Sequence, residues 1–337
     1  MNDHSAGRRL IELMAGFWKT QAIYIATESG IIDALDRAGR STAIALALET
    51  DTDPDALGRL LLFLRALDVV EGDEESAGYA LTAVGELLRT GTRDSMRDHV
   101  RIYGSHFYQA WGELAHCLRT GGSAFSHVFG SDLFSYLNDH PDTSLAYERA
   151  MVAGTLFFSE VSTVHDFSTA RRIVDVAGGH GALLNEILNA NTAAHAVLFD
   201  APHVIEEAAS RPIATDHAGR CELVPGNFFE SVPADGDVYL LSRILHCFDD
   251  EACQDILANC RRAMAPDGRL IIIERLLTQD TGSSLAQGYN MHMLVVLGGG
   301  RERDEAQYRT LLDKAGFTTV DLHPLPLETH LIVATPR

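Results

Sequence analysis

The sequence lacks the long apolar run that a membrane-spanning helix requires, and its first residues do not have the charged-then-apolar layout of a secretory signal. Its five cysteines form no Cys-x-x-Cys pair and no framework spacing, so we expect free thiols and a cytoplasmic protein. Positive charge is also scarce, since 27 lysines and arginines stand against 47 acids and the formal net charge is -20. Such a chain is repelled by nucleic acid and by anionic lipid, so we expect neither nucleic acid nor a membrane as a partner.

The N-terminal part, residues 1–100, is expected to form a winged-helix module. Hydrophobic residues make up 46% of the chain, enough for a large core and for more than one domain. Apolar positions at helical spacing are followed by a turn and a short strand. A DNA-binding helix needs exposed cations, but Asp51, Asp53 and Asp55 surround the start of the candidate helix, which disfavours DNA binding. The apolar residues 10–35 instead predict a surface that a second copy of the chain buries, in a homodimer.

The rest of the chain has two patterns. Residues 101–165 are rich in aromatic side chains at helical spacing and predict a helical connector that contributes to a substrate pocket. In residues 166–337, short apolar runs alternate with helical stretches, which predicts an α/β domain with a Rossmann-like, doubly wound parallel sheet. The ending TTVDLHPLPLETHLIVATP has the pattern of two strands joined directly, so we expect an antiparallel pair at the end of the sheet.

The first strand-to-helix turn of this sheet is rich in glycine. It contains Asp175, Gly178, Gly179 and Gly181. Glycines allow the backbone to approach a ligand closely, and Asp200 at the end of the next strand can accept hydrogen bonds from a ribose. A nicotinamide dinucleotide would require glycine where the sequence has Leu184, so the loop favours a ribose ligand without phosphates, such as S-adenosylmethionine. The alternative is a tight turn that binds no ligand.

Several motifs occur in a fixed order along the chain. They are VDVAGGHG, LFDAPHVIEEA, GNFFESVP, LLSRILHCFDDE, IIIERLL, GGGRERD and LLDKAGF. This order resembles the S-adenosylmethionine-dependent O-methyltransferases that act on small aromatic molecules, a class with plant phenolic and bacterial polyketide enzymes. ESGIIDAL, RLLLFLRALDVVE and YALTAVGELL resemble that family's dimerisation domain, so the likeness covers nearly the whole chain. GDVYLLSRIL, Trp18-Lys19 and LPLETHLIVA further resemble bacterial phenazine methyltransferases.

The resemblance implies a class I methyltransferase fold, no metal, and S-adenosyl-L-homocysteine as the product of the cofactor. It implies that the glycine loop with Asp175 holds the amino acid end of the cofactor and that Asp200 binds its ribose. The other cofactor residues that it implies are Asn227, Phe228 and Phe248 around adenine, with Ser242 and Arg243 at the carboxylate. Asn227 departs from the family, which usually has an acid there.

His246 lies where an apolar strand ends and an acidic helix begins. A neutral imidazole can take the proton from a phenol during methyl transfer, provided that a carboxylate orients its other nitrogen. The resemblance implies that Glu274 and Glu302 are these carboxylates, and the alternative for Glu274 is pairing with Arg275 or water. A metal site at His246 is disfavoured, because acids in a first helical turn are expected from capping and no second histidine lies at ligand spacing.

The substrate is expected between the aromatic helices and the sheet. The candidate residues are His106, Phe107, Trp111, Met151, Phe157, Asn290, Met291 and Met293. Cys247 stands where many family members have an acid or amide, which fits a more apolar, fused-ring substrate. We therefore expect O-methylation of an aromatic secondary metabolite, with a hydroxyphenazine as the specific prediction. The alternatives are an N- or C-methyltransferase and a noncatalytic regulator that has kept the cofactor fold.

Overall fold

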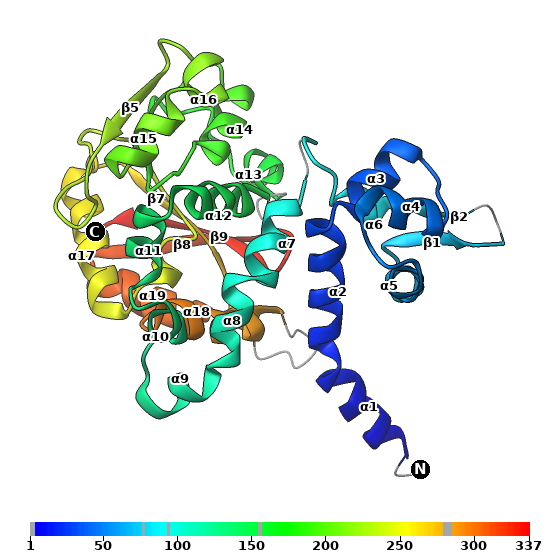
Figure 1. Cartoon of the computed structure of the whole chain (residues 1–337). Helices are drawn as coiled ribbons and strands as arrows, with labels where there is room; N and C mark the ends of the chain where they lie inside the picture. The colour runs from blue at the N-terminus through cyan, green and yellow to red at the C-terminus, as the bar shows by residue number, and fades with distance from the viewer. Residues whose placement is uncertain (1–3, 76–77, 93–94, 154–156, 279–284) are drawn as a thin grey trace. The chain divides into compact units, whose positions relative to one another are not determined.

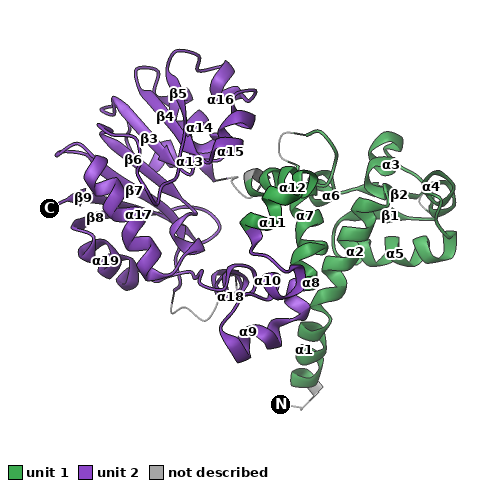
Figure 2. Ribbon diagram, turned by 60° about the vertical axis from the view of Figure 1, so that its left-hand side comes forward, with its two compact units in different colours: residues 1–109, 134–154 green, residues 110–133, 155–337 purple. Residues whose placement is uncertain are grey.

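The computed structural model describes residues 4–75, 78–92, 95–153, 157–278 and 285–337. They belong to two compact units, which are coloured separately in Figure 2. The helical unit comprises residues 1–109 and 134–154, and the sheet unit comprises residues 110–133 and 155–337. The segment 101–165, which we expect to be a connector, therefore contributes residues to both units. None of the helices in the described ranges combines the length and the apolar character needed to span a membrane.

The described residues of the helical unit form short helices and a β-hairpin (Figure 1). Its elements are α1 (His4–Met14), α2 (Gly16–Glu28), α3 (Ile31–Ala38), α4 (Ala43–Thr50), α5 (Pro54–Ala66), β1 (Val70–Asp73), β2 (Gly78–Leu81), α6 (Ala83–Glu86), α7 (Arg97–Gly104) and α12 (Pro141–Ala153). α8 (His106–Gly112) and α11 (Leu133–Asp139) cross from one unit to the other along the chain. Asp53 caps α5 by accepting the Ala56 N–H at 2.8 Å, with Pro54 in the first turn. The antiparallel pair of β1 and β2 forms the expected wing.

The sheet unit alternates strands with helices. Its elements are α9 (Leu114–Thr120), α10 (Ala124–Phe129), α13 (Phe158–Val164), β3 (Arg172–Val176), α14 (Ala182–Ala190), β4 (His195–Asp200), α15 (Pro202–Ala208), α16 (Pro212–Thr215), β5 (Cys221–Pro225), β6 (Val238–Ser242), η1 (Leu245–Cys247), α17 (Asp250–Ala263), β7 (Arg269–Arg275), α18 (Leu285–Leu297), α19 (Glu305–Lys314), β8 (Phe317–Pro324) and β9 (Thr329–Pro336). Their order agrees with the α/β pattern of the sequence.

The strands form one sheet with the order β5-β4-β3-β6-β7-β9-β8. β5, β4, β3, β6 and β7 are parallel, while β9 and β8 run antiparallel to their neighbours, which confirms the expected ending of the sheet. The chain proceeds outward from β3 to β5 and then returns to β6 on the other side of β3. In open α/β sheets, ligands bind at the carboxyl ends of the strands at such a switch point. The site is therefore expected beyond the ends of β3 and β6.

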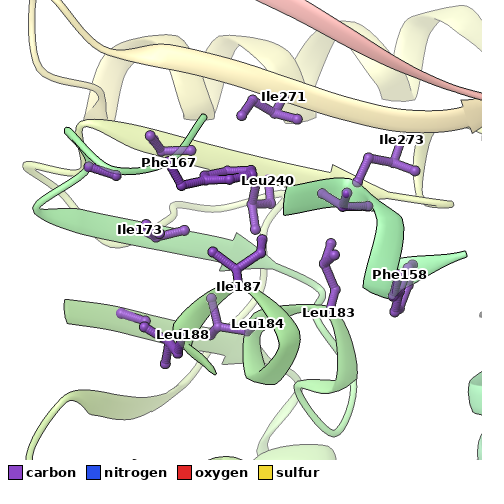
Figure 3. Packing of buried hydrophobic residues seen from close by; sticks show 14 of the residues in the cluster. Phe158, Phe167, Ile173, Leu183, Leu184, Ile187, Leu188, Leu240, Ile271 and Ile273 are labelled. Atoms are coloured by element: carbon purple, nitrogen blue, oxygen red, sulfur yellow. The ribbon is translucent and has the colours of Figure 1, made fainter. Parts of the chain in front are cut away.

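Both faces of this sheet are covered by apolar side chains, because successive residues of a strand point to opposite faces. One cluster joins Ile173 of β3 and Leu240 of β6 to helix α14, and Figure 3 shows Leu184 and Ile187 among these residues. A second cluster joins Val174 and neighbouring strand residues to α17 and α19. Burial on both faces leaves the loops at the strand ends as the place where polar side chains gather.

Candidate functional site

The glycine loop after β3 is a place where larger side chains do not fit. A Cβ at Gly178 would lie 2.5 Å from Oδ2 of Asp175 and 2.6 Å from Cδ1 of Leu198. Gly181 is the N-cap of α14 with φ of 75°, and a Cβ there would lie 2.7 Å from Ile213. Two of the predicted glycines are therefore required by close packing, and Gly181 also by its left-handed backbone.

Asp200 closes this loop from the end of β4. Its Oδ2 accepts the N–H of Gly179 at 2.8 Å, and its Oδ1 accepts the N–H of Ala201 at 2.7 Å. Each carboxylate oxygen can accept a further hydrogen bond. The arrangement therefore fits the pair of ribose hydroxyls that we expect Asp200 to bind.

Asp175 is a buried carboxylate at the same loop, only 1% exposed. Neither of its oxygens has a hydrogen-bond partner among the described residues. Burial, with a smaller effect from the charge of Asp200, raises the pKa of Asp175 from 3.8 to about 7. A polar group of this kind is costly unless a ligand or a proton satisfies it, which fits a binding site for a cationic cofactor.

Three aromatic rings gather beside the residues expected at adenine. The rings of Phe228 and Phe248 are 5.9 Å apart, and the ring of Phe229, which the sequence did not single out, is 5.3 Å from Phe248. Asn227 is exposed, and its amide accepts the Phe229 N–H at 3.0 Å and donates to Glu230 at 3.2 Å. The aromatic rings fit a flat base, whereas the amide of Asn227 is engaged within its own turn.

Ser242 and Arg243 follow directly at the end of β6. The Oγ of Ser242 is buried and has no hydrogen-bond partner in the described ranges, so it can still bind a ligand atom. Arg243 has a left-handed backbone with φ of 57°, donates its N–H to Ile273 O at 2.9 Å and lies over the Phe158 ring at 5.9 Å. A strained arginine at the switch point fits the expected contact with the cofactor carboxylate.

His246 lies in η1 between two buried glutamates that come from distant segments. Its Nδ1 is 3.0 Å from Oε1 of Glu302 and 3.6 Å from Oε2 of Glu274. Both carboxylates are fully buried, whereas the imidazole is 12% exposed. Oε1 of Glu274 also accepts the N–H of Leu245 at 2.8 Å and that of His246 at 3.4 Å. The structure thus brings together the three residues predicted as catalytic.

The electrostatics of this cluster favour a bound proton. Burial alone would lower the pKa of His246, but Glu274, Cys247 and Glu302 outweigh it and raise the pKa well above 6.5. Burial raises the pKa of Glu274 above 4.5, although His246 opposes this. The ligand atoms of the three residues lie within 4.8 Å of one another, which is also close enough for a cation. In the neutral imidazole, a proton on Nδ1 is donated to Glu302 and Nε2 is left to accept a proton from a substrate.

Glu302 is held by residues of β7 and α18. Oδ1 of Asn290, a residue that we expected at the substrate, accepts the N–H of Glu302 at 3.1 Å and so holds this loop. Arg275 does not pair with Glu274. Its Nη1 lies 3.8 Å from Oε1 of Glu302, and its guanidinium lies 3.8 Å above the ring of Tyr289. Glu302 therefore faces two positive groups, a histidine and an arginine.

Of the acids that follow His246, Asp249 serves the next helix, as expected, whereas Asp250 pairs with a cation of a distant segment. Asp249 caps α17 by accepting the N–H of Ala252 at 2.9 Å. Asp250 pairs with Arg303, whose Nη2 lies 2.7 Å from Oδ1 of Asp250. Arg303 was missed from the sequence, where RERD has the pattern of an exposed, charged turn. The only available signal was its position next to Glu302.

The residues expected at the substrate belong to both units. His106, Phe107 and Met151 are in the helical unit, and Trp111, Phe157, Asn290, Met291 and Met293 are in the sheet unit. Trp111 is partly exposed and donates from Nε1 to Nδ1 of His292 at 3.1 Å, with the two rings stacked at 12°. Phe107 and Phe157 are buried, which agrees with a packing role. Contact of these residues with a substrate stays a prediction.

Comparisons with known proteins agree with this geometry. The model of an O-methyltransferase domain matches residues 111–318, and the model of an O-methyltransferase dimerisation domain matches residues 11–91. The chain is 74% identical over 99% of its length to 3-amino-4-hydroxybenzoate 4-O-methyltransferase from Streptomyces cremeus, of which 91% is covered. It is 35% identical over 97% of its length to phenazine O-methyltransferase PhzM from Lysobacter antibioticus, of which 95% is covered.

The crystal structure of human N-acetylserotonin methyltransferase, solved with S-adenosylmethionine, superposes with a TM-score of 0.89 at 27% identity and covers 100% of this chain and 99% of that one. The fold of this chain therefore matches that of a solved methyltransferase. The chain belongs to the S-adenosylmethionine-dependent O-methyltransferases and carries the N-terminal dimerisation domain of that family.

Proposed function

We propose that this protein methylates the phenolic oxygen of a small aminohydroxybenzoate, with His246 as the general base. The substrate class is supported by the 74% identity to the enzyme that acts on 3-amino-4-hydroxybenzoate. The hydroxyphenazine expected from the sequence has weaker support, because the likeness to the phenazine enzyme is 35%. The small aromatic acid is therefore the first candidate, and a hydroxyphenazine is the competitor to test.

The observation that carries the proposal is the hydrogen bond from Nδ1 of His246 to Glu302, 3.0 Å long, with Glu274 at 3.6 Å. Two carboxylates on one imidazole nitrogen fix the ring and stabilise the imidazolium that forms when the other nitrogen takes a proton. The bound cofactor supplies an electrophilic methyl group. The acceptor oxygen would bond to this methyl carbon as the carbon–sulfur bond broke with its electron pair left on sulfur, and Nε2 of His246 would take the phenolic proton.

The carboxylates also reduce the cost of this proton transfer. A phenol with a pKa of about 10 and an imidazole with a pKa of about 6.5 differ by about 3.5 units, so transfer is uphill by about 5 kcal/mol. Glu274, Cys247 and Glu302 raise the pKa of His246, and each unit of increase removes about 1.4 kcal/mol from that difference. An arylamine attacks through a lone pair that is already free, so a base matched to a phenol favours oxygen as the acceptor.

The experiment compares His246→Ala with His323→Gln, a control at a partly exposed histidine of β8 that pairs with Asp321. Turnover is measured with methyl-labelled cofactor, and cofactor affinity by calorimetry. His246→Ala should lose about 10²- to 10⁴-fold in turnover and bind cofactor normally, whereas the control should match the parent protein. Near-normal turnover of His246→Ala would refute the base assignment.

The substrate is tested with a panel of acceptors. The panel holds 3-amino-4-hydroxybenzoate, its analogue without the amino group, its analogue without the hydroxyl, and a hydroxyphenazine. We expect methylation of the first two, with the methyl group on oxygen in the product. Turnover of the analogue without the hydroxyl would instead indicate an N-methyltransferase. Faster turnover of the hydroxyphenazine than of 3-amino-4-hydroxybenzoate would favour the hydroxyphenazine as the substrate.

We also propose that the protein is a homodimer through its N-terminal part. The dimerisation-domain match covers residues 11–91, and α1 and α2 expose large apolar side chains. They include Leu10, Ile11, Phe17 and Trp18, each more than half exposed. Large exposed apolar side chains on two consecutive helices favour a surface that another chain covers.

A further inference from the structure

Arg303 is a buried cation whose partners all lie around the turn that carries His246. Its side chain is only 1% exposed. Nη1 donates to the carbonyl of Leu245 at 2.9 Å, and Nη2 donates to the carbonyl of Phe248 at 2.9 Å. Nε and Nη2 both reach Oδ1 of Asp250, at 3.0 and 2.7 Å. A buried charge with this many partners fixes the relative position of all of them.

The two carbonyls that Arg303 binds flank the catalytic turn. Leu245 precedes His246 and Phe248 follows Cys247, so the guanidinium spans η1 from one end to the other. The backbone of Leu245 is held on both sides of its Cα, because its N–H donates to Glu274 at 2.8 Å while its carbonyl accepts from Arg303 at 2.9 Å. The backbone before His246 is therefore clamped between a carboxylate and a guanidinium.

The segment around Arg303 also contacts His246 directly. The N–H of Arg301 donates to the carbonyl of His246 at 2.8 Å, and a Cβ at Gly300 would lie 2.8 Å from the same oxygen. The backbone of Arg303 is tied to the end of β7, since its carbonyl accepts the N–H of Leu277 at 3.0 Å. One short segment thus supplies Glu302 to the imidazole and attaches the backbone of His246 to the sheet.

We propose that Arg303 is a positioning residue that holds the imidazole of His246 in register with Glu274 and Glu302. The inference rests on the proposed role of His246 as the base. Arginine suits this task because its planar fork reaches two carbonyls and one carboxylate at once. A lysine carries the same charge but has a single nitrogen, so it cannot span η1.

The charged and titratable groups around His246 come from four segments. They are Glu274 and Arg275 of β7, Cys247 of η1, Glu302 and Arg303 of the loop between α18 and α19, and Tyr308 of α19. If Arg303 is removed, η1 is released and the imidazole moves away from its two carboxylates. Its pKa should then fall towards the ordinary value of 6.5.

The test uses Arg303→Met and Arg303→Lys, with Arg309→Met as the matched control. Arg309 pairs with Glu305 on the exposed face of α19 and lies in the same part of the chain. Turnover, cofactor affinity and the pH midpoint of kcat are measured for each protein. Arg303→Met should lose about 10- to 100-fold in kcat with unchanged cofactor affinity, as expected for a misplaced catalytic group. The pH midpoint of Arg303→Met should also move to lower pH. Arg303→Lys should show a smaller loss of kcat and a smaller shift of the midpoint, and the Arg309→Met control should show neither change.

A loss of kcat without a shift of the midpoint would overturn the proposal, because general destabilisation lowers activity at every pH alike. If Arg303→Met does not fold, Asp250→Asn removes the carboxylate from Arg303 and leaves the two carbonyl contacts, and it should shift the midpoint in the same direction by less. An unshifted midpoint in Asp250→Asn would then overturn the proposal.

The titration of His246 is also followed by NMR of nitrogen-labelled histidines, assigned with His246→Ala. This measurement does not depend on catalysis. An active His246→Ala protein would refute the base, whereas an unchanged His246 titration in Arg303→Met, or in Asp250→Asn, would refute the positioning role.

Discussion

Replacing Asp175 by asparagine should make the stability of the sheet unit less dependent on pH. In the folded protein the pKa of Asp175 is raised to about 7 by burial and by Asp200, while its ordinary value is 3.8. Below about pH 4 both states are protonated, so this carboxyl group costs nothing. As the pH rises to about 7, the unfolded chain ionises while the folded protein keeps its proton, so stability is lost over that window and then levels off.

The magnitude follows from the two pKa values of Asp175. A rise from 3.8 to about 7 is about 3 units and corresponds to about 4 kcal/mol over the whole window. Between about pH 5 and pH 7.5 the expected change is about 3 kcal/mol, which for a unit of this size is roughly 6–12 °C in melting temperature. The asparagine side chain does not ionise, so the Asp175→Asn variant should gain this amount relative to the parent protein as the pH rises.

The assay is thermal unfolding of Asp175→Asn and the parent protein at several pH values without cofactor. The asparagine can also change the melting temperature by an amount that does not depend on pH. The diagnostic quantity is therefore how the difference in melting temperature between the two proteins changes with pH. Cofactor titrations provide a second readout. S-adenosylmethionine is a cation, so the parent protein should bind it more tightly as the pH rises through about 7, whereas Asp175→Asn should bind it weakly at every pH. A melting-temperature difference that stays constant between about pH 5 and pH 8 would refute the reasoning.

Three further predictions concern the site and the dimer. The kcat/KM should rise with pH through a midpoint above 6.5, because the active form of His246 is neutral and its pKa is raised; a flat profile from about pH 5 to 8 would count against this. Gly178→Ala should weaken cofactor binding about 10- to 100-fold in calorimetry, since its Cβ would lie 2.5 Å from a carboxylate oxygen, whereas Gly288→Ala, with no atom within 4 Å, should not. Trp18→Asp should dissociate the dimer in sedimentation experiments, and an unchanged sedimentation coefficient would exclude the α1 and α2 surface as the contact.

The sequence allowed the sheet and the catalytic cluster to be predicted because both depend on local signals. Apolar strands alternating with helices predict a parallel sheet, whose carboxyl ends meet at one edge, so Asp200 and His246 were expected near the glycine loop. Glu274 stood out as an acid inside an apolar strand. Glu302, on a loop 56 residues after His246, followed only from the family resemblance.

The contacts that escaped prediction depend on how loops pack on one another. Arg303 lies in a charged turn, and such turns are exposed in most proteins, so its burial has no local signature. Asn290 was assigned to the substrate from its helix, but its amide holds the backbone of Glu302. Helical spacing also does not indicate which core a helix joins, which is why the segment 101–165 contributes to both units.

The hydrogen bond from Gly179 to Asp200 has a consequence for the rate and selectivity of cofactor capture. The carboxylate expected to receive the ribose also accepts the N–H of Gly179 at 2.8 Å and so holds the loop in its bent form. Ordering one backbone residue costs roughly 1–2 kcal/mol, so a loop that had to fold around its ligand would lose several kcal/mol of affinity. A loop that Asp200 holds in this form avoids that loss, so we expect cofactor association to be a single fast step without a slow rearrangement. Discrimination between the cofactor and its demethylated product must then come from groups near the sulfur, because the ribose end is the same in both.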